Sequence, residues 1–570
     1  MDRLSDLRSL LKAQRLDGFI LPKEDRFQSE HLPPWEERLA WLTGFTGSAG
    51  LAIVLIDRAA LFVDGRYLLA ASRQVSNAFQ VISEAPACWI KQALPKAGTI
   101  GFDPWQLTEA HLKRFQKAVS HLVFRPVMKN FVDTLWKNRP VPIFPKIIPH
   151  EECFSGASSQ QKREEVLRTV RKFGAQALLL TDPASIAWLL NMRADTPYVP
   201  APPAYALLEG DMKVALFSDI LEFPPISECT RHSFAELKTV IEALCVETIL
   251  IDPEEAPCGV INFLTSANKK LVREQNPCQQ LKSIKNVTEL CGFRACHKRD
   301  AVAVIEFFAW LNKALLHTPV NEWSASEKLL AFRARDSLFQ GASFETISAA
   351  GANAAFIHYH TPRAAARALM PGELYLLDSG GHYQDGTTDC TRTIGLGSIT
   401  NERIKRIYTT VLKSLIAVTT TVFPKETYGA ALDSIARRPL WALGLDYAHG
   451  TGHGVGHFLN VHETPPNISR FSKTSLKAGM VLSIEPGYYE ADAFGIRLEN
   501  LVEVVHAPEA SEFLAFSSLT LLPFEPALLE KGLLTLEEIS WLKIYHDTIW
   551  NLLSGYLSEE GQNWLKRRML

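Results

Sequence analysis

The stretch that most constrains the fold is residues 372–395, GELYLLDSGGHYQDGTTDCTRTIG. An apolar, β-prone segment precedes Asp378, and a threonine-rich segment follows Asp389, with glycines and an Asp-Gly pair between them. This pattern predicts two antiparallel β-strands joined by a tight turn, with the two aspartates placed symmetrically about it. Opposite residues of such a pair point to one face of the sheet. Because two buried, facing carboxylates repel unless they are protonated or bridged by cations, the hairpin predicts a metal site.

A second hairpin is expected over residues 480–505. Glu485 and Glu499 each follow an apolar strand and lie symmetrically about a turn near Asp492. Exposed hairpin charges are the alternative, but the neighbours Ile484 and Leu498 favour burial, where an unpaired carboxylate is costly. The second pair of carboxylates therefore joins the first as candidate metal ligands.

Between the two hairpins lies a segment rich in glycine and histidine, with His449, His453, His457 and His462. A lone histidine is usually a core or surface residue, but four of them interspersed with glycines favour a site, since glycine allows the backbone to approach closely. For His457 in particular we expect packing or solvent exposure, with a role behind the ligands as the alternative.

The four carboxylates together carry a charge of about −4, which two divalent cations would neutralise. A set of mostly oxygen ligands with one imidazole suits Mn²⁺, Co²⁺ or Fe²⁺, with Zn²⁺ as a further alternative, whereas a structural zinc site would use thiolates. Two such ions about 3.5–4 Å apart can share a hydroxide and polarise a carbonyl group. The chemistry indicated is metal-assisted hydrolysis.

The pattern of helices and strands divides the chain into three domains. Residues 1–150 indicate an α/β domain, and residues 151–283 repeat its layout, for example where 186–189 (IAWL) echo 39–42 (LAWL). Two copies of one unit predict two similar N-terminal α/β domains, against the alternative of chance similarity between ordinary αβ patterns. The boundary between them is expected in the proline-rich segment 140–150.

Residues 284–570 are expected to form the third domain, with helices over 286–314, 324–336 and 401–422 in addition to the two hairpins. Its C-terminal extension, from about residue 515, has a capping box formed by Thr535 and Glu538. The extension is rich in tryptophan and tyrosine, which fits either packing against the domain or a subunit interface.

Bulk properties exclude several classes of function. The net charge of −2 gives no electrostatic basis for binding nucleic acid or an anionic membrane. No run of 18 apolar residues and no secretory signal are visible, so no membrane span is expected. The nine cysteines are scattered without a pairing pattern, which indicates reduced thiols and a cytoplasmic protein. Cys390, beside Asp389, is expected to be a packed thiol that points away from the site.

Taken together, these residues resemble the creatinase/aminopeptidase P family of metallopeptidases, and within it the large, three-domain cytosolic type. The resemblance covers nearly the whole chain. It rests on ERLAWLTGFTGSAG and FVDGRYLLAA in the first domain, and on ISAAGANAAFIHYH, LLDSGGHYQDGTTDCTRT, HGTGHGVGHFLNVHETP and SIEPGYYEADAFGIRLENLVEV in the third. It implies two creatinase-type N-terminal α/β domains followed by a C-terminal pita-bread catalytic domain.

The resemblance also implies a ligand set for two divalent metals, most commonly Mn²⁺, with Co²⁺ and Zn²⁺ as alternatives. Asp378 would bind one metal through both oxygens. Asp389 and Glu499 would bridge the two metals, and His453 and Glu485 would complete the second. The activity implied is release of the N-terminal residue from peptides with proline in second position.

Further roles follow from the same resemblance. His358 and His462 match substrate-binding and proton-shuttling histidines, and His449 matches a third histidine of that site. Arg38 matches an N-terminal-domain arginine that reaches toward the substrate across a dimer or domain boundary. From strand alternation, Arg497 is expected on the face of Glu499, where it could orient a ligand; a surface arginine is the alternative. Proline-containing peptides are the expected substrates, and a homodimer is the expected assembly.

Alternative functions remain open. A prolidase, which cleaves Xaa-Pro dipeptides, shares all five ligands but is usually shorter, with one N-terminal unit. A methionine aminopeptidase lacks both N-terminal domains. A non-catalytic pita-bread protein that binds peptides or acts as a histone chaperone, or a creatinase-like hydrolase without metal, is disfavoured because this chain has every ligand. Tyr488 and His449 are candidates for the pocket that holds the proline ring.

Overall fold

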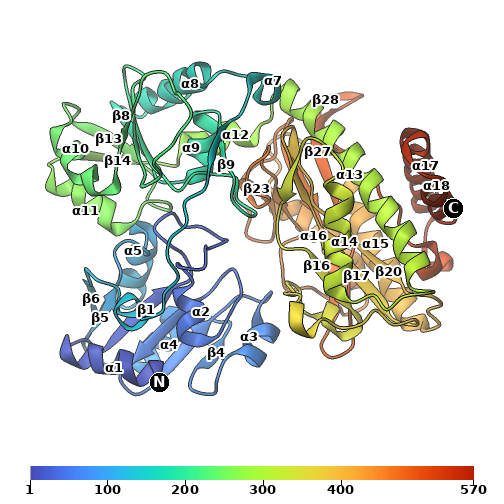
Figure 1. The fold of residues 1–570 in the computed structure, drawn as a ribbon, viewed down its shortest axis with the longest axis horizontal. Helices are drawn as coiled ribbons and strands as arrows, with labels where there is room; N and C mark the ends of the chain where they lie inside the picture. Colours follow the sequence, from blue (N-terminus) through green and yellow to red (C-terminus); the bar gives the residue numbers. More distant parts are fainter. Residues whose placement is uncertain (1, 570) are drawn as a thin grey trace. The chain divides into compact units, whose positions relative to one another are not determined.

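The structure is a computed structural model that describes residues 2–569. It contains two compact units (Figure 1). The first unit comprises residues 2–149, 157–195 and 201–279, and the second comprises 150–156, 196–200 and 280–569.

The first unit contains two six-stranded sheets. The strands of the first sheet are β1 (Gly18–Pro22), β2 (Leu51–Leu55), β3 (Ala59–Phe62), β4 (Gln80–Ile82), β5 (Gly98–Phe102) and β6 (Leu122–Pro126). Those of the second are β8 (Ala177–Leu180), β10 (Tyr205–Glu209), β11 (Val214–Phe217), β12 (Cys229–His232), β13 (Thr248–Ile251) and β14 (Lys270–Arg273). A separate strand pair consists of β7 (Ile147–Pro149) and β9 (Met192–Ala194).

The two six-stranded sheets have the same topology. The order β4-β3-β2-β1-β5-β6 in the first corresponds to β12-β11-β10-β8-β13-β14 in the second. In both sheets, the inner strand pairs antiparallel with one neighbour and parallel with the other. This correspondence confirms the prediction of two similar N-terminal α/β domains.

The central strands of these sheets are buried on both faces, which explains their uninterrupted apolar sequences. In the first sheet, Ile20 and Ile53 belong to one core cluster and Phe19 and Val54 to another, as the alternation of side chains along a strand requires. The helices of the unit are α1 (Arg3–Ala13), α2 (Arg38–Thr43), α3 (Leu68–Gln74), α4 (Pro86–Ala93), α5 (Glu109–Ala118), α6 (Phe131–Leu135), α8 (Ser159–Lys172), α9 (Pro183–Leu189), α10 (Leu237–Ala243) and α11 (Cys258–Ser266), and α12 (Pro277–Ser283) links the two units.

The second unit has the pita-bread fold and contains both predicted hairpins. Its strands are β15 (Phe339–Ala342), β16 (Ile347–Ala350), β17 (Leu374–Ser379), β18 (Gly381–Tyr383), β19 (Gly386–Thr387), β20 (Cys390–Gly395), β21 (Phe423–Pro424), β22 (Gly452–Gly454), β23 (Glu463–Ile468), β24 (Val481–Ile484), β25 (Gly487–Glu490), β26 (Phe494–Arg497), β27 (Asn500–Ala507) and β28 (Ala510–Ser518). They form sheets in the orders β16-β17-β20, β15-β18-β19, β21-β28-β27-β24-β22-β23 and β25-β26.

The helices of the second unit are α7 (Glu152–Ser155), α13 (Val287–Ala314), α14 (Glu322–Arg333), α15 (Glu402–Thr419), α16 (Gly429–Trp441), α17 (Leu536–Leu553) and α18 (Glu559–Lys566). Helices α13 and α14 lie side by side (Figure 1). The C-terminal helices are packed against the unit, since α18 contacts α13 and α17 contacts both α13 and α15.

The predicted helix boundaries hold within a few residues, and capping accounts for them. Helix α13 begins directly after Asn286, whose side chain caps it in a capping box with Glu289. Helix α14 starts two residues before the expected position because Asn321 caps it. The expected capping box of Thr535 and Glu538 opens α17.

Two further observations concern the whole described chain. None of the helices within residues 2–569 combines the length and the apolar character that a membrane crossing requires. All nine cysteines are free thiols.

Candidate metal centre

The candidate ligands lie at the ends of neighbouring strands of the second unit. Asp389 directly precedes β20 and Glu499 directly precedes β27, while Asp378 lies near the end of β17. His453 is the middle residue of β22, and Glu485 directly follows β24. Because β22, β24 and β27 are consecutive in one sheet, three of these side chains come from adjacent strands.

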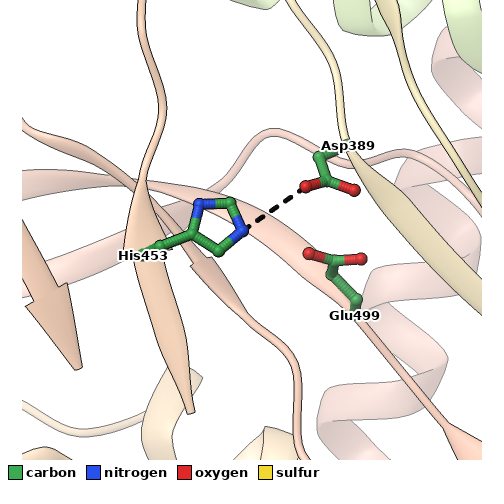
Figure 2. Close-up of side chains that lie close together, drawn as sticks. All are labelled: Asp389, His453 and Glu499. Carbon is green, nitrogen blue, oxygen red and sulfur yellow. Dashed lines mark ion pairs between the residues drawn. The ribbon is translucent and has the colours of Figure 1, made fainter. Parts of the chain in front are cut away.

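Asp389, His453 and Glu499 form the tightest part of the cluster. Each offers a ligand atom, and these atoms all lie within 4.8 Å of one another. In Figure 2 the imidazole of His453 faces the two carboxylates. Its Nε2 lies 3.5 Å from Oδ2 of Asp389 and 3.6 Å from Oε1 of Glu485.

The first hairpin differs from its predicted register. Asp378 pairs with Thr391 across β17 and β20, so it is not directly opposite Asp389. The connection is also not a tight turn, because it contains the small strands β18 and β19, which pair with each other, and β18 also pairs with β15. An offset of two residues preserves the face of the sheet, so both aspartates still point the same way.

The second hairpin follows its predicted symmetry. Ile484 pairs with Asn500 and Gly487 pairs with Arg497, which places Glu485 and Glu499 across from each other in the same register. The turn contains Asp492, whose backbone has a φ of 60°, in the left-handed region.

Burial and the proximity of like charges shift the pKa values of the cluster's ionisable groups. Burial is the main cause that raises the pKa of Asp378 to about 6, with the charge of Asp389 adding to it and Arg497 opposing it. Burial and the charge of Asp389 likewise hold the pKa of Glu499 well above its usual range. Burial alone would lower the pKa of His453, but Asp389 and Glu485 outweigh it and raise this pKa to about 9.

These residues fit a cationic centre. Oδ1 of Asp378 and Oδ1 of Asp389 are buried, and neither has a hydrogen-bond partner among the described residues. Buried oxygen atoms without a partner carry a free-energy cost that a bound cation would remove. Four carboxylates and one imidazole form a donor set suited to divalent metals that prefer oxygen.

Arg497 lies beside the cluster and is buried. Its Nη2 donates to Oδ2 of Asp378 at 2.5 Å, and its Nε donates to Oγ1 of Thr391 at 3.1 Å. Thr391 in turn donates to Oε2 of Glu499 at 2.8 Å. The arginine therefore contacts one candidate ligand directly and a second through a threonine.

Tyr489 is a residue of this region that the sequence reasoning did not single out. Its hydroxyl lies 2.8 Å from Nη1 of Arg497 and 2.9 Å from Nε2 of His449, so it connects the two. Strand alternation could have indicated Tyr489. Gly487 pairs with Arg497, and Tyr489 lies two positions further along the same strand, so its side chain points to the same face of the sheet as Arg497. Tyr488, a candidate for the proline pocket, donates to Oε2 of Glu490 at 3.3 Å.

The remaining predicted histidines are arranged next to the ligands. The rings of His453 and His462 are 4.4 Å apart between centroids and nearly perpendicular. The ring of His358 lies 6.5 Å from that of His462 and is nearly parallel to it. His457 is buried away from them and packs against Phe293 at 5.5 Å, in keeping with the packing expected for it.

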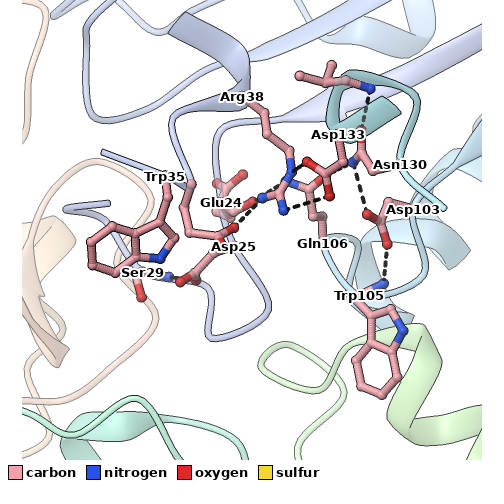
Figure 3. Close-up of polar contacts among 12 residues, drawn as sticks. Glu24, Asp25, Ser29, Trp35, Arg38, Asp103, Trp105, Gln106, Asn130 and Asp133 are labelled. Atoms are coloured by element: carbon pink, nitrogen blue, oxygen red, sulfur yellow. Dashed lines mark hydrogen bonds and ion pairs between the residues drawn. The ribbon is translucent and has the colours of Figure 1, made fainter. Parts of the chain in front are cut away.

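Arg38 belongs to the first unit, at the start of α2 (Figure 3). Its Nε donates to Oδ1 of Asp133 at 2.7 Å, and its Nη1 donates to Glu36. The guanidinium is buried, and its two acidic partners hold it in one orientation.

Fold and donor set together define a metallopeptidase with a pita-bread catalytic domain, and comparison with known proteins agrees. The sequence profile of metallopeptidase family M24 matches residues 292–506. Profiles of the creatinase/prolidase N-terminal domain match residues 3–134 and 138–289, and that of the C-terminal region of peptidase M24 matches residues 512–569.

The chain is similar over its length to proteins named probable Xaa-Pro aminopeptidase P. The protein from Coccidioides posadasii (strain C735) is 36% identical, with 99% of this chain and 92% of the relative covered. The protein from Laccaria bicolor is 38% identical, with 99% and 92% covered. The chain therefore belongs to the aminopeptidase P family of M24 metallopeptidases.

Solved structures give the same result. The X-prolyl aminopeptidase of Caenorhabditis elegans, described as a cytosolic enzyme with a di-nuclear active site, matches with a TM-score of 0.94 and 31% identity over 100% of this chain and 99% of its own. A Xaa-Pro dipeptidase from Bacillus anthracis shares the fold with a TM-score of 0.51 and 22% identity, but covers only 65% of this chain and 99% of its own.

Proposed function

We propose that this chain is a metal-dependent aminopeptidase that releases the N-terminal residue from peptides with proline in second position. The observation that carries the proposal is the likeness to the Caenorhabditis elegans X-prolyl aminopeptidase, which extends over the whole chain and includes both N-terminal domains. The cluster of Asp389, His453 and Glu499, in which both carboxylates are buried and the imidazole is partly exposed, supplies the chemistry that such an enzyme requires.

We assign Asp378, Asp389, His453, Glu485 and Glu499 as the residues that hold two divalent cations. Mn²⁺ is the metal that an oxygen-rich donor set with one imidazole favours, with Co²⁺ and Zn²⁺ as alternatives. When bound, two such cations polarise the scissile carbonyl and lower the pKa of the attacking water. Arg497 orients Asp378 through its hydrogen bond to Oδ2, and both oxygens of this carboxylate would help to hold the cation.

The histidines next to the cluster handle the substrate and the proton. His462 contacts the ligand His453, so its ring is placed to stabilise the tetrahedral intermediate or to pass a proton to the leaving nitrogen. His358, stacked against His462, is assigned to hold the peptide. His449 is anchored by Tyr489 and contributes to the same region. For Arg38, a role in substrate binding stays a prediction.

The leaving group determines which peptides fit. The Xaa-Pro bond is a tertiary amide without an N–H, so its site requires apolar surface for the ring and no acceptor for an amide proton. The free α-amine of the substrate would face this acidic, metal-bearing pocket, where its neutral form could act as a metal ligand.

A direct test is peptide cleavage by the purified full chain supplied with Mn²⁺. We expect release of arginine from Arg-Pro-Pro, measured by chromatography of the products, together with about two metal ions per chain by elemental analysis. The absence of cleavage with every divalent metal, together with no bound metal, contradicts the proposal. Cleavage of Xaa-Pro dipeptides alone identifies a prolidase, the second candidate, whose structural relatives match only part of this chain.

We also propose three domains, at residues 1–150, 151–283 and 284–570, with the C-terminal extension starting near residue 515. The matched profiles, which change near residues 134–138, 289–292 and 506–512, support this division. A cytoplasmic location is supported by the nine free thiols and by the cytosolic relative. A homodimer remains an expectation, which sedimentation of the purified protein tests.

A further inference from the structure

Arg392 is a buried arginine on β20, on the side of the strand that faces away from the ligands. Side chains alternate along a strand. Thr391 points to the metal centre, where its hydroxyl donates to Glu499, and Arg392 therefore points to the opposite side. There it meets the C-terminal extension, which starts after β28.

The guanidinium of Arg392 joins the backbone next to a ligand with the C-terminal extension. On the ligand side, Nη1 donates to the carbonyl oxygens of Glu499 at 2.5 Å and Thr391 at 2.9 Å, and Nη2 donates to Oδ1 of Asn500 at 2.8 Å. On the side of the extension, its acceptors are the carbonyl oxygens of Leu522 at 2.6 Å and Pro523 at 3.1 Å and the hydroxyl of Tyr545 at 3.2 Å.

No acidic side chain within residues 2–569 forms an ion pair with this guanidinium. A buried charge without a counter-ion is tolerated only where hydrogen-bond acceptors surround it. The ring of Phe524, 4.4 Å from Cζ, adds a cation–π contact. Neutral acceptors next to Glu499 and in the C-terminal extension thus fix the position of Arg392. The same hydrogen bonds hold these two segments together.

Tyr545 is the point at which helix α17 takes part in this arrangement. Its hydroxyl lies 2.9 Å from the carbonyl oxygens of both Thr520 and Leu522, and it accepts from Nδ2 of Asn500 at 3.2 Å. Its ring stacks on Trp541, with centroids 5.1 Å apart, so the hydroxyl is held by packing as well as by hydrogen bonds. Asn500 directly follows the candidate ligand Glu499.

We propose that Arg392 and Tyr545 are positioning residues of the metal centre, through which the C-terminal extension fixes the backbone of Glu499 and hence its placement relative to Asp389. The inference rests on the proposed function, because it takes Glu499 as a ligand. Both ligands directly precede the strands that Arg392 joins, so a displacement of the Glu499 carbonyl moves its carboxylate. Substitution of a residue that supports a metal ligand typically weakens metal binding by about 10–100-fold.

The test uses the full chain carrying Tyr545→Phe, which removes one hydroxyl and keeps the packed ring. We expect about 10-fold weaker Mn²⁺ binding in calorimetric titration of the metal-free protein, and an altered visible absorption spectrum of the Co²⁺-loaded protein. Tyr556→Phe is the matched control, because Tyr556 belongs to the same extension but is exposed and does not contact Arg392. It is expected to bind Mn²⁺ and Co²⁺ as the unaltered chain does.

Arg392→Lys is the second variant, because lysine keeps the charge but has three donors on a single nitrogen, whereas Arg392 donates from three separate nitrogens. We expect a larger loss of Mn²⁺ affinity than for Tyr545→Phe. Unchanged Mn²⁺ affinity and an unchanged Co²⁺ spectrum in Tyr545→Phe overturn the inference, whether or not Arg392→Lys folds. If the unaltered chain itself binds no divalent metal, the proposed function fails instead, so the two failures are distinguishable.

Discussion

At the scale of single residues, the metal centre is a set of carboxylates whose charges oppose one another. Two of them have a neighbour that limits their freedom: Arg497 for Asp378, and Thr391 for Glu499. The raised pKa of Glu499 shows what the pocket costs a charged group when no cation is present.

This argument predicts the effect of Glu499→Gln. An amide cannot replace a carboxylate that binds two cations, so we expect peptide cleavage to fall by at least about 100-fold, with less metal bound. The matched control is Glu503→Gln, since Glu503 lies on β27, the strand that Glu499 directly precedes, and pairs with Arg294 outside the cluster. Near-normal cleavage by Glu499→Gln would show that the ligand assignment is wrong.

A second residue-level prediction concerns His546 in the C-terminal extension. Burial lowers its pKa to about 4, with the charge of Arg392 adding to the effect, and its Nε2 accepts from the backbone of Phe524. The folded pKa lies below the unfolded value of about 6.5, so the unfolded state binds the proton first and stability is lost as pH falls from about 6.5 to 4.

We expect this histidine to contribute about 1.4 kcal/mol of the stability lost between pH 8 and pH 5.5. Urea unfolding at the two pH values measures the loss, and His546→Gln, which keeps an acceptor, should show that much less of it. An identical loss in the variant would show that His546 is not the titrating group.

At the scale of elements, β23 is fixed to the start of the second unit by a buried charge cluster. Glu463, its first residue, forms ion pairs with Lys285 and with Lys282, the latter at 3.2 Å, and all three side chains are buried. Glu463 directly follows His462, so the cluster also holds the backbone of a histidine assigned to catalysis. Burial lowers the pKa of Lys285, and the attraction of Glu463 opposes this.

Glu463→Gln is expected to destabilise the second unit by about 3–5 kcal/mol, because removing one partner leaves two buried cations without compensation. Urea unfolding measures the change. Glu512→Gln is the control: Glu512 is exposed and forms a surface ion pair with Lys425, so a change within about 0.5 kcal/mol is expected. A similarly small change for Glu463→Gln would mean that the lysines are neutral in the folded protein.

A site residue could be predicted where the pattern that marks it lies within a few positions of it in the sequence, and not where its role depends on a residue far away in the sequence. Asp378 and Glu499 could be predicted as candidates because each follows an apolar strand, and Asp389 because it precedes a threonine-rich strand; such patterns are visible within a few residues. Arg392 and Tyr545 could not, since they are 153 positions apart and nothing local marks either as a partner of the other. The interrupted turn of the first hairpin was missed because β18 pairs with β15, a strand outside the hairpin.

At the scale of the whole molecule, the fold was predictable because the chain repeats one αβ layout before a unit of different pattern. The echo of residues 39–42 in 186–189 corresponds to α2 and α9, which follow β1 and β8, the matching inner strands of the two sheets. The order of apolar strands and intervening helices along the sequence is enough to predict an α/β domain. The exact domain boundaries stay a prediction.

The hydrogen bonds that surround Arg392 have a consequence for biosynthesis. A chain still emerging from the ribosome has β20 long before it has Leu522, Pro523 and Tyr545, which are among the acceptors of the guanidinium. Until then the arginine has no complete set of partners to bury it, although domains nearer the N-terminus can already fold. Partial chains that end before α17 are therefore not expected to hold a finished active site.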